Sequence, residues 1–210
     1  MMAQPEHGAP SPQTPAAVVI GGSAGSLDVL RGIIRVLPAQ LACPVVVVLH
    51  IGQRAPEGLS ELLARECALP VRQVEDKEPA EGGVVYLAPP GYHLLIESHR
   101  AFALSVDEPV YFSRPSIDVL FESACDAYDR HLLAMLLSGA SADGAAGMLE
   151  AHRRGATTIV QTPGSAESPA MPLAALALFN PTCVWTPAEM ARELPALLAD
   201  IRTSATGSPA

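Results

Sequence analysis

Residues 16–26, which read AAVVIGGSAGS, decide the fold. Five apolar residues run directly into a turn of glycine and serine. A short run with no polar alternation is typical of a parallel strand buried on both faces. A helical pattern follows at 27–37 and ends before Pro38, and a second apolar run, PVVVVL, occupies 44–49. This strand–helix–strand order predicts a right-handed crossover between parallel strands.

The same alternation continues along the chain. Further helices are expected at 56–68, 116–128, 145–154, 172–179 and 187–201, and further strands at 131–137 and 157–161. Short strand candidates at 83–87, 93–96 and 102–106 are separated by turn signals, and together they are interpreted as an antiparallel flap at the edge of the sheet. The predicted fold class is therefore α/β, with a doubly wound, mostly parallel sheet flanked by helices and a small antiparallel β flap at one edge.

The length of 210 residues fits one domain, expected at 16–202. Residues 1–15 are rich in Pro, Gln and Ser, and residues 203–210 are small and polar, so both are predicted to be flexible tails. The start of the chain lacks the basic and apolar regions of a secretory signal, and its apolar runs are too short to span a bilayer. The expected location is the cytoplasm, without membrane insertion.

Composition excludes some partners and cofactors. A formal net charge of -9 argues against nucleic acid, whose phosphates would be repelled over most of the surface. Cys43, Cys67, Cys125 and Cys183 are far apart and form no Cys-x-x-Cys pair, so buried structural thiols are favoured over a metal site or a disulfide framework. We expect no metal and no cofactor.

The turn after the first strand has two interpretations. Residues 21–25, GGSAG, match the Gly-x-Ser-x-Gly pattern in which glycines expose a nucleophilic serine, here Ser23. A phosphate-binding loop is the alternative, but a dinucleotide motif ending at Gly25 would need glycine at Ile20. Such a site would also need an acidic residue after the second strand, where His50 stands. Glycine and serine are common in such turns, so the pattern alone does not decide.

Two further polar groups follow predicted strands. His50 follows the second strand directly, and is either a proton acceptor or a histidine hydrogen-bonded at the rim of the core. Asp143 lies in the small-residue loop SGASADGAAG at 138–147, and it could simply cap the helix that follows. The small residues of this loop leave backbone N–H groups accessible, as an oxyanion site requires.

Taken together, Ser23, His50 and Asp143 follow three strands of one parallel sheet, whose carboxyl ends meet at one edge. The predicted mechanism has His50 remove the proton of Ser23, Ser23 attack a carbonyl carbon, and Asp143 orient the imidazolium. The chain order Ser, His, Asp differs from the Ser, Asp, His order of α/β-hydrolases.

Seven short motifs resemble the protein-glutamate methylesterases of bacterial chemotaxis, the CheB catalytic domain. They occur in family order over about residues 16–180 and read IGGS (20–23), VLHI (48–51), VVYLAPPGYH (84–93), RPSIDVLF (114–121), LLSG (136–139), ADGAAGM (142–148) and MP (171–172). The resemblance implies that Ser23, His50 and Asp143 carry the family's triad. It also implies hydrolysis of glutamyl γ-methyl esters in the cytoplasmic region of chemoreceptors, with release of methanol, and deamidation of selected glutamines.

The resemblance also implies an oxyanion site and pocket. By position, the family's oxyanion donor in the aspartate loop falls at the backbone N–H of Ala140. The other pocket residues expected are Ala24, Gly139 and Met171, although Met171 could equally fill a gap in the core. Arg114 is expected to pair with Asp118 or a neighbouring carboxylate, with contact to a substrate peptide as the alternative.

The chain departs from the family pattern in three places. The receiver domain that usually precedes the catalytic domain is not expected here, so control would come from a separate response regulator. Ala24, Gly25 and Ser26 stand where the family tends to have threonine and a glycine pair, and Ala140-Ser141 replaces Met-Gly. These changes affect the pocket wall and leave two alternatives open, a serine esterase of another substrate and a non-catalytic receptor-binding signalling module.

Overall fold

The computed structural model describes residues 15–50 and 58–199. The predicted tails, except for residue 15, lie outside the described residues, and so does the beginning of the helix expected at 56–68. Within the described ranges, no helix is long and apolar enough to cross a membrane.

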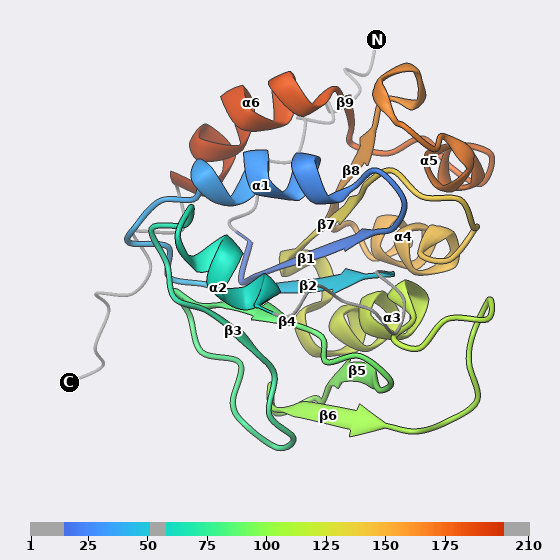
Figure 1. The fold of residues 1–210 in the computed structure, drawn as a ribbon. Helices are drawn as coiled ribbons and strands as arrows, with labels where there is room; N and C mark the ends of the chain where they lie inside the picture. The colour runs from blue at the N-terminus through green and yellow to red at the C-terminus, as the bar shows by residue number, and fades with distance from the viewer. Residues whose placement is uncertain (1–14, 51–57, 200–210) are drawn as a thin grey trace, which may run out of the picture.

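A seven-stranded, wholly parallel sheet forms the centre of the molecule (Figure 1), in the order β3-β4-β2-β1-β7-β8-β9. The strands are β1 (Ala17–Gly22), β2 (Val45–Leu49), β3 (Val71–Gln73), β4 (Val85–Leu87), β7 (Leu132–Leu136), β8 (Thr157–Gln161) and β9 (Cys183–Trp185). A separate antiparallel pair is formed by β5 (His93–Ile96) and β6 (Phe102–Ser105). The predicted fold class is therefore confirmed.

Helices cover both faces of the sheet (Figure 1). One layer contains α1 (Leu27–Arg35), α2 (Leu59–Ala64) and α6 (Pro187–Ala199), and the other contains α3 (Ile117–Tyr128), α4 (Ala145–Arg153) and α5 (Ala170–Leu176). Two short 3₁₀ helices, η1 (Asp129–His131) and η2 (Pro163–Ser165), complete the elements. The β5–β6 pair lies beyond α3.

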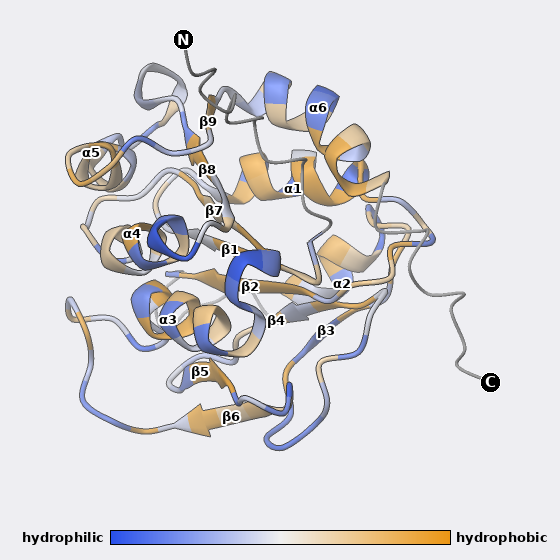
Figure 2. Ribbon diagram, turned by 180° about the vertical axis from the view of Figure 1, so that it is seen from behind, coloured by the Kyte–Doolittle hydropathy of each residue, from blue (hydrophilic) through white to orange (hydrophobic). Residues whose placement is uncertain are grey.

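Alternate residues of the central strands supply two separate cores. In β1, Val18 and Ile20 pack toward α1, whereas Val19 packs toward α3. Because both faces are covered, these strands contain almost no polar side chain, and Figure 2 shows them among the most hydrophobic parts of the ribbon. This burial explains why the apolar runs of the sequence predict the strands correctly.

The errors concern short elements at the sheet edges. The expected strand at 83–87 was grouped with the flap, but β4 pairs in parallel with β2 and β3 inside the main sheet, so that grouping was wrong. The strands β3 and β9 were not predicted. Each has three residues and is only partly buried, and such segments have no clear apolar pattern.

Gly21, near the end of β1, allows α3 to begin against the sheet. A Cβ atom at this position would overlap the Cγ2 atom of Ile117, the first residue of α3. The absence of a side chain at Gly21 thus lets the Ile117 side chain pack directly on the backbone of β1. This approach matters for the site, because the Ile117 N–H faces it.

We predict that Gly21→Ala destabilises the protein by about 1–3 kcal/mol, because the new methyl group overpacks the contact with Ile117. Gly32→Ala is the matched control: its Cβ would meet no atom within 4 Å, and alanine favours the helix by up to ~1 kcal/mol. Urea unfolding followed by circular dichroism measures both. Equal stabilities for the two variants would contradict the close approach.

Candidate active site

The three polar positions predicted from sequence follow β1, β2 and β7, which are neighbours in the sheet. The His50 N–H donates to the carbonyl of Gly22 over 2.9 Å, and the Ser23 N–H donates to the carbonyl of Ser138 over 2.8 Å. The parallel ladders thus continue one or two residues past the strands. They bring the backbones of Ser23, His50 and Ser138 together at one edge.

The turn that carries Ser23 is held by its own hydrogen bonds and by Ser138. The hydroxyl of Ser26 donates to the Ser23 carbonyl over 2.6 Å, and Gly25 adopts a φ of 75°, which favours glycine. The buried Ser138 hydroxyl donates to the Ala24 carbonyl over 2.6 Å. Sequence reasoning missed this role of Ser138, since a serine in a small-residue loop has no distinguishing pattern.

Asp143 is fully buried at the beginning of α3. Its carboxylate accepts hydrogen bonds from the Ser116 hydroxyl over 2.9 Å and from the backbone N–H groups of Ile117 over 2.8 Å and Asp118 over 2.9 Å. The helix that follows Asp143 in the chain, α4, has Gly144 as its N-cap and no side-chain cap. Asp143 therefore binds the N-terminus of a different helix from the one that its sequence position suggested.

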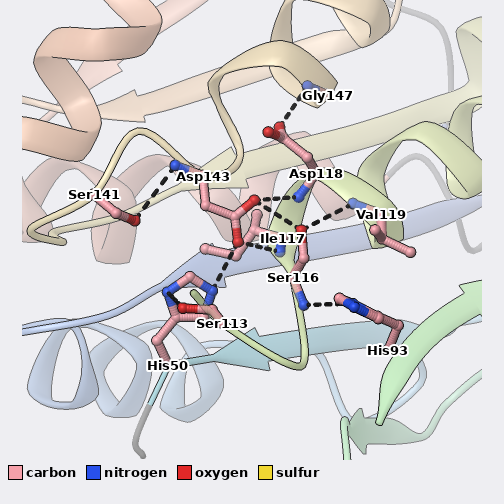
Figure 3. A network of polar contacts seen from close by, with 10 residues as sticks. All are labelled: His50, His93, Ser113, Ser116, Ile117, Asp118, Val119, Ser141, Asp143 and Gly147. Atoms are coloured by element: carbon pink, nitrogen blue, oxygen red, sulfur yellow. Dashed lines mark hydrogen bonds and ion pairs between the residues drawn. The ribbon is translucent and has the colours of Figure 1, made fainter. Parts of the chain in front are cut away.

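His50 contacts this carboxylate through one ring nitrogen and a hydroxyl through the other (Figure 3). Its Nε2 atom lies 2.8 Å from Oδ2 of Asp143, a close polar contact at hydrogen-bond length but without good hydrogen-bond alignment. Its Nδ1 atom lies 3.5 Å from the Ser113 hydroxyl. Within the described ranges, no hydrogen bond joins the Ser23 hydroxyl to His50.

Opposing effects act on the Asp143 carboxyl. Burial alone would raise its pKa, but the contact with His50 and the hydrogen bonds from Asp118, Ile117 and Ser116 outweigh burial, so the pKa lies below its ordinary value. The carboxylate consequently stays charged at neutral pH. It favours a proton on the facing nitrogen of His50, which leaves the Nδ1 lone pair of a neutral ring free.

A second buried carboxyl, Asp118, lies beside the first. Burial, together with the nearby charge of Asp143, raises the pKa of Asp118 from 3.8 to about 6, although a hydrogen bond from the Gly147 N–H over 2.8 Å opposes the rise. The two carboxyls are thus shifted in opposite directions. The opposite shifts follow from the number of polar partners, since Asp143 has four, namely His50 and three hydrogen-bond donors at the N-terminus of α3.

The predicted pocket residues lie around Ser23. Gly139 donates its N–H to the Ser168 carbonyl and accepts from the Met171 N–H, both over 2.9 Å. A Cβ at Gly139 would lie 2.5 Å from the terminal carbon of Met171 and 3.0 Å from Cβ of Ser23. Met171 is fully buried and belongs to the core on the α3 side. It therefore packs behind the Ser23 turn.

The backbone N–H groups of Ala24 and Ala140 follow two neighbouring strands of the sheet. Ala24 and Ala140 are both exposed, and within the described part of the chain neither N–H donates a hydrogen bond. The Gly139 N–H, by contrast, is already used. These two donors come from the loops after the neighbouring strands β1 and β7, and the loop after β1 also carries Ser23.

Arg114 pairs with neither of the partners expected from sequence. Its Nη1 donates to the carbonyls of Val106 over 2.7 Å and Asp107 over 3.0 Å, so the expected pairing with Asp118 was wrong. His93, which sequence analysis treated only as a strand residue, is buried and accepts the Ser116 N–H on Nδ1 over 3.2 Å. It thereby holds the serine that binds Asp143.

No group of three or more metal-binding side chains occurs within residues 15–50 and 58–199. Cys43 and Cys125 are buried and Cys67 and Cys183 partly buried, and all four are free thiols. Burial raises the pKa of Cys43 and Cys125 to about 12, so both thiols remain protonated at neutral pH.

This arrangement of strand ends has known counterparts. A family model described as CheB methylesterase matches residues 18–194. The chain belongs to the CheB methylesterase family. Its structure aligns with the crystal structure of the Thermotoga maritima CheB methylesterase catalytic domain with a TM-score of 0.81 and 27% sequence identity, over 90% of this chain and 100% of that one.

Curated relatives in the CheB methylesterase family carry a double name. A putative protein-glutamate methylesterase/protein-glutamine glutaminase of Leptospira interrogans is 43% identical over 160 residues, which cover 76% of this chain and 83% of that protein. The protein-glutamate methylesterase/protein-glutamine glutaminase 2 of Cupriavidus metallidurans is 36% identical over 169 residues, covering 80% of this chain and 50% of that protein.

We predict that Asp118→Asn changes the pH dependence of stability. The native pKa of about 6 exceeds the ordinary 3.8, so the native state binds more protons between these values and the wild type loses stability as pH rises. Asparagine can keep the hydrogen bond from Gly147 without the charge. Its advantage over the wild type should grow by on the order of 1–2 kcal/mol between pH 4 and pH 8.

Urea unfolding at several pH values measures this difference. Asp126→Asn on the same helix is the control, because Asp126 is exposed and its ion pair with Arg154 is a surface pair. Parallel pH profiles for the wild type and Asp118→Asn would contradict the proposed burial of charge.

Proposed function

We propose that the protein hydrolyses glutamyl γ-methyl esters of chemoreceptors and deamidates receptor glutamines, with Ser23 as nucleophile, His50 as base and Asp143 as orienting carboxylate. The observation that carries the proposal is the 2.8 Å contact between His50 and the buried Asp143, one strand away from the exposed turn of Ser23. Membership of the CheB methylesterase family and the double name of its relatives support this choice of substrate.

In the first half of the reaction, Ser23 Oγ attacks the γ-carbonyl carbon while its proton passes to the Nδ1 lone pair of His50. Because Asp143 is charged and fixed, it stabilises the imidazolium that results. The tetrahedral intermediate then collapses. The C–O bond to the methoxy group breaks, and the proton of His50 goes to the leaving oxygen. Methanol departs, and the glutamyl group remains bound to Ser23 as an ester.

This step requires Ser23 Oγ to replace Ser113 as the neighbour of Nδ1. Hydrogen bonds of a catalytic group are often long in the absence of substrate and shorten in the complex. The 3.5 Å contact with Ser113 is weak and should yield readily. Rotation of the Ser23 side chain, together with a small adjustment of the imidazole, is the motion that we propose.

The free N–H groups of Ala24 and Ala140 serve as oxyanion donors in this proposal. The charge of the intermediate develops on the γ-oxygen, and donors that are already in place cost no reorganisation when it appears. In the second half, water gives a proton to His50 and attacks the acyl carbon. The C–O bond to Ser23 breaks as His50 returns the proton to Ser23 Oγ, and the glutamate side chain leaves and ionises to a carboxylate. A glutamine substrate follows the same path with ammonia as the leaving group.

The proposed partner is the cytoplasmic region of a methylated chemoreceptor, which places the proposed activity in the cytoplasm. Control by a separate response regulator is part of the same proposal. It rests on the family resemblance alone.

We predict that Ser23→Ala abolishes methanol release from a methylated receptor fragment, lowering the rate by at least about 10³-fold, since no nucleophile remains. Gas chromatography of the released methanol measures it, with circular dichroism confirming the fold. The same rate in both proteins would remove Ser23 from its role. Turnover of p-nitrophenyl acetate without turnover of the receptor would instead indicate a serine esterase of another substrate.

We predict that Asp143→Asn lowers kcat by about 10³–10⁴-fold, because an amide favours the wrong tautomer of His50 and does not stabilise its charged form. Asp118→Asn is the neighbouring control and should retain activity within about tenfold. Single-turnover measurements on the methylated fragment separate the chemical step from product release. Comparable losses in both variants would mean that Asp143 acts only in folding.

A further inference from the structure

A turn with two aromatic residues, at positions 110–113, projects beside the candidate site. Its aromatic side chains belong neither to the hydrophobic core nor to the proposed triad. Val110 and Ser113 exchange two backbone hydrogen bonds of 3.1 and 2.8 Å, which leaves Tyr111 and Phe112 alone at the tip of a two-residue turn. Tyr111 is 51% exposed, and Phe112 is fully exposed. Hydrophobic burial in the folded chain therefore does not account for these side chains.

The backbone of this turn is unfavourable for the residues that it contains. Tyr111 has a φ of 48° and Phe112 a φ of 61°, in the left-handed region where turns of this length normally have asparagine and glycine. Each such residue costs on the order of 1 kcal/mol or more. Within the described ranges they are the only adjacent pair of non-glycine residues with positive φ. Strain that contributes nothing to packing points to a function.

The segments on either side of the turn, residues 106–110 and 113–114, are hydrogen-bonded to side chains near the site. Arg114 donates to the carbonyls of Val106 and Asp107, and His93 contacts the carbonyl of Glu108 over 3.1 Å, most simply by donating from Nε2 because its Nδ1 accepts from Ser116. The segment that carries the aromatic tip is thus held by two side chains. One of them, His93, also holds the serine that binds Asp143. The tip is in this way built on the same support as the catalytic carboxylate.

The turn also lies next to His50 and to another exposed aromatic residue. Ser113, the residue after Phe112, places its hydroxyl 3.5 Å from Nδ1 of His50. The Gly91 N–H donates to the Arg114 carbonyl over 3.3 Å, which brings the turn containing Tyr92 next to the aromatic turn. Tyr92 is 43% exposed. We call Tyr92, Tyr111 and Phe112 the aromatic lip.

We infer that the aromatic lip binds apolar side chains of the substrate polypeptide next to the glutamyl ester, and so selects the sites that the enzyme uses. This inference rests on the proposed function. The occupant is a polypeptide because the lip begins one residue away from the contact with His50 and extends outward, where a small ester would not reach. The aromatic lip is apolar, although the chain has a net charge of -9. We therefore expect shape complementarity and hydrophobic burial, and not charge, to dominate binding of the polypeptide.

The double variant Tyr111→Asn/Phe112→Gly tests this inference without disturbing the fold. Asn-Gly is the preferred sequence for a two-residue turn of this kind, so the variant should be at least as stable as the wild type. Val184→Thr is the matched control, since Val184 is 42% exposed on the edge strand β9, remote from β2. The probes are two helical peptides with one glutamyl γ-methyl ester, flanked by leucines in one and by serines in the other, and p-nitrophenyl acetate.

We expect the wild type and Val184→Thr to prefer the leucine-flanked peptide in kcat/KM by on the order of tenfold, chiefly through KM, and the double variant to lose this preference. Hydrolysis of p-nitrophenyl acetate should be unchanged. An unchanged peptide preference in the double variant would overturn the inference. An equal loss with p-nitrophenyl acetate would also overturn it, because the turn would then act on His50 and not on the substrate.

Binding of the leucine-flanked peptide, measured by calorimetry in the Ser23→Ala background, separates this inference from the proposed function. A wild type that hydrolyses neither peptide would contradict the proposed function, yet weaker binding by the double variant would still support the lip. Equal binding with and without the aromatic pair would contradict the lip even where esterase activity is present.

Discussion

The Asp143 carboxylate is buried from water, and four polar partners compensate for the lost solvation: His50, the Ser116 hydroxyl and the N–H groups of Ile117 and Asp118. A buried charge without such partners would cost several kcal/mol, so these partners must stay in place together. The loop after β7, the end of β2 and the beginning of α3 are therefore fixed relative to one another by one carboxylate. Removing any one partner would leave the charge poorly compensated.

This arrangement also explains how the site controls protonation. The N-terminus of α3 supplies partial positive charge and free N–H groups to Asp143, which lowers its pKa, whereas Asp118 in the first turn of the same helix has fewer donors and a raised pKa. One helix end thus holds a charged carboxylate against His50 and a second carboxyl that titrates near neutrality. The negative charge on Asp143 thus lies next to the imidazole of His50, where it can stabilise the imidazolium of the proposed mechanism.

The molecule separates its proposed chemistry from its proposed recognition. The nucleophile, base and carboxylate follow buried parallel strands, whose packing on both faces leaves little freedom of position. The aromatic lip stands instead on a strained two-residue turn joined to that framework by Arg114 and His93. Substitutions in such a turn can change the side chains that meet the substrate without altering the strand ends. The same proposed catalytic residues can therefore serve different substrate sequences.

Sequence reasoning succeeded where burial leaves a simple pattern. The runs 16–20 and 44–49 predicted β1 and β2, and the helix expected at 116–128 corresponds to α3. It missed β3 and β9 and placed the segment of β4 in the flap, because a three-residue strand is defined by its partners and has too few residues to show a period. The carboxyl-end rule for parallel sheets predicts that Ser23, His50 and Asp143 lie at one edge, and the strands that they follow, β1, β2 and β7, are neighbours in the sheet.

The sequence alone determined the α/β class, the polar groups that follow the strands and their common edge, because these depend on the local alternation of apolar and polar residues. Only the tertiary structure decided that Asp143 binds α3 and not α4, that His93 and Ser138 support the site, and that two aromatic residues project beside His50. These facts depend on contacts between segments that are distant in the chain. Such contacts are set by how helices pack across the sheet, which no local pattern records.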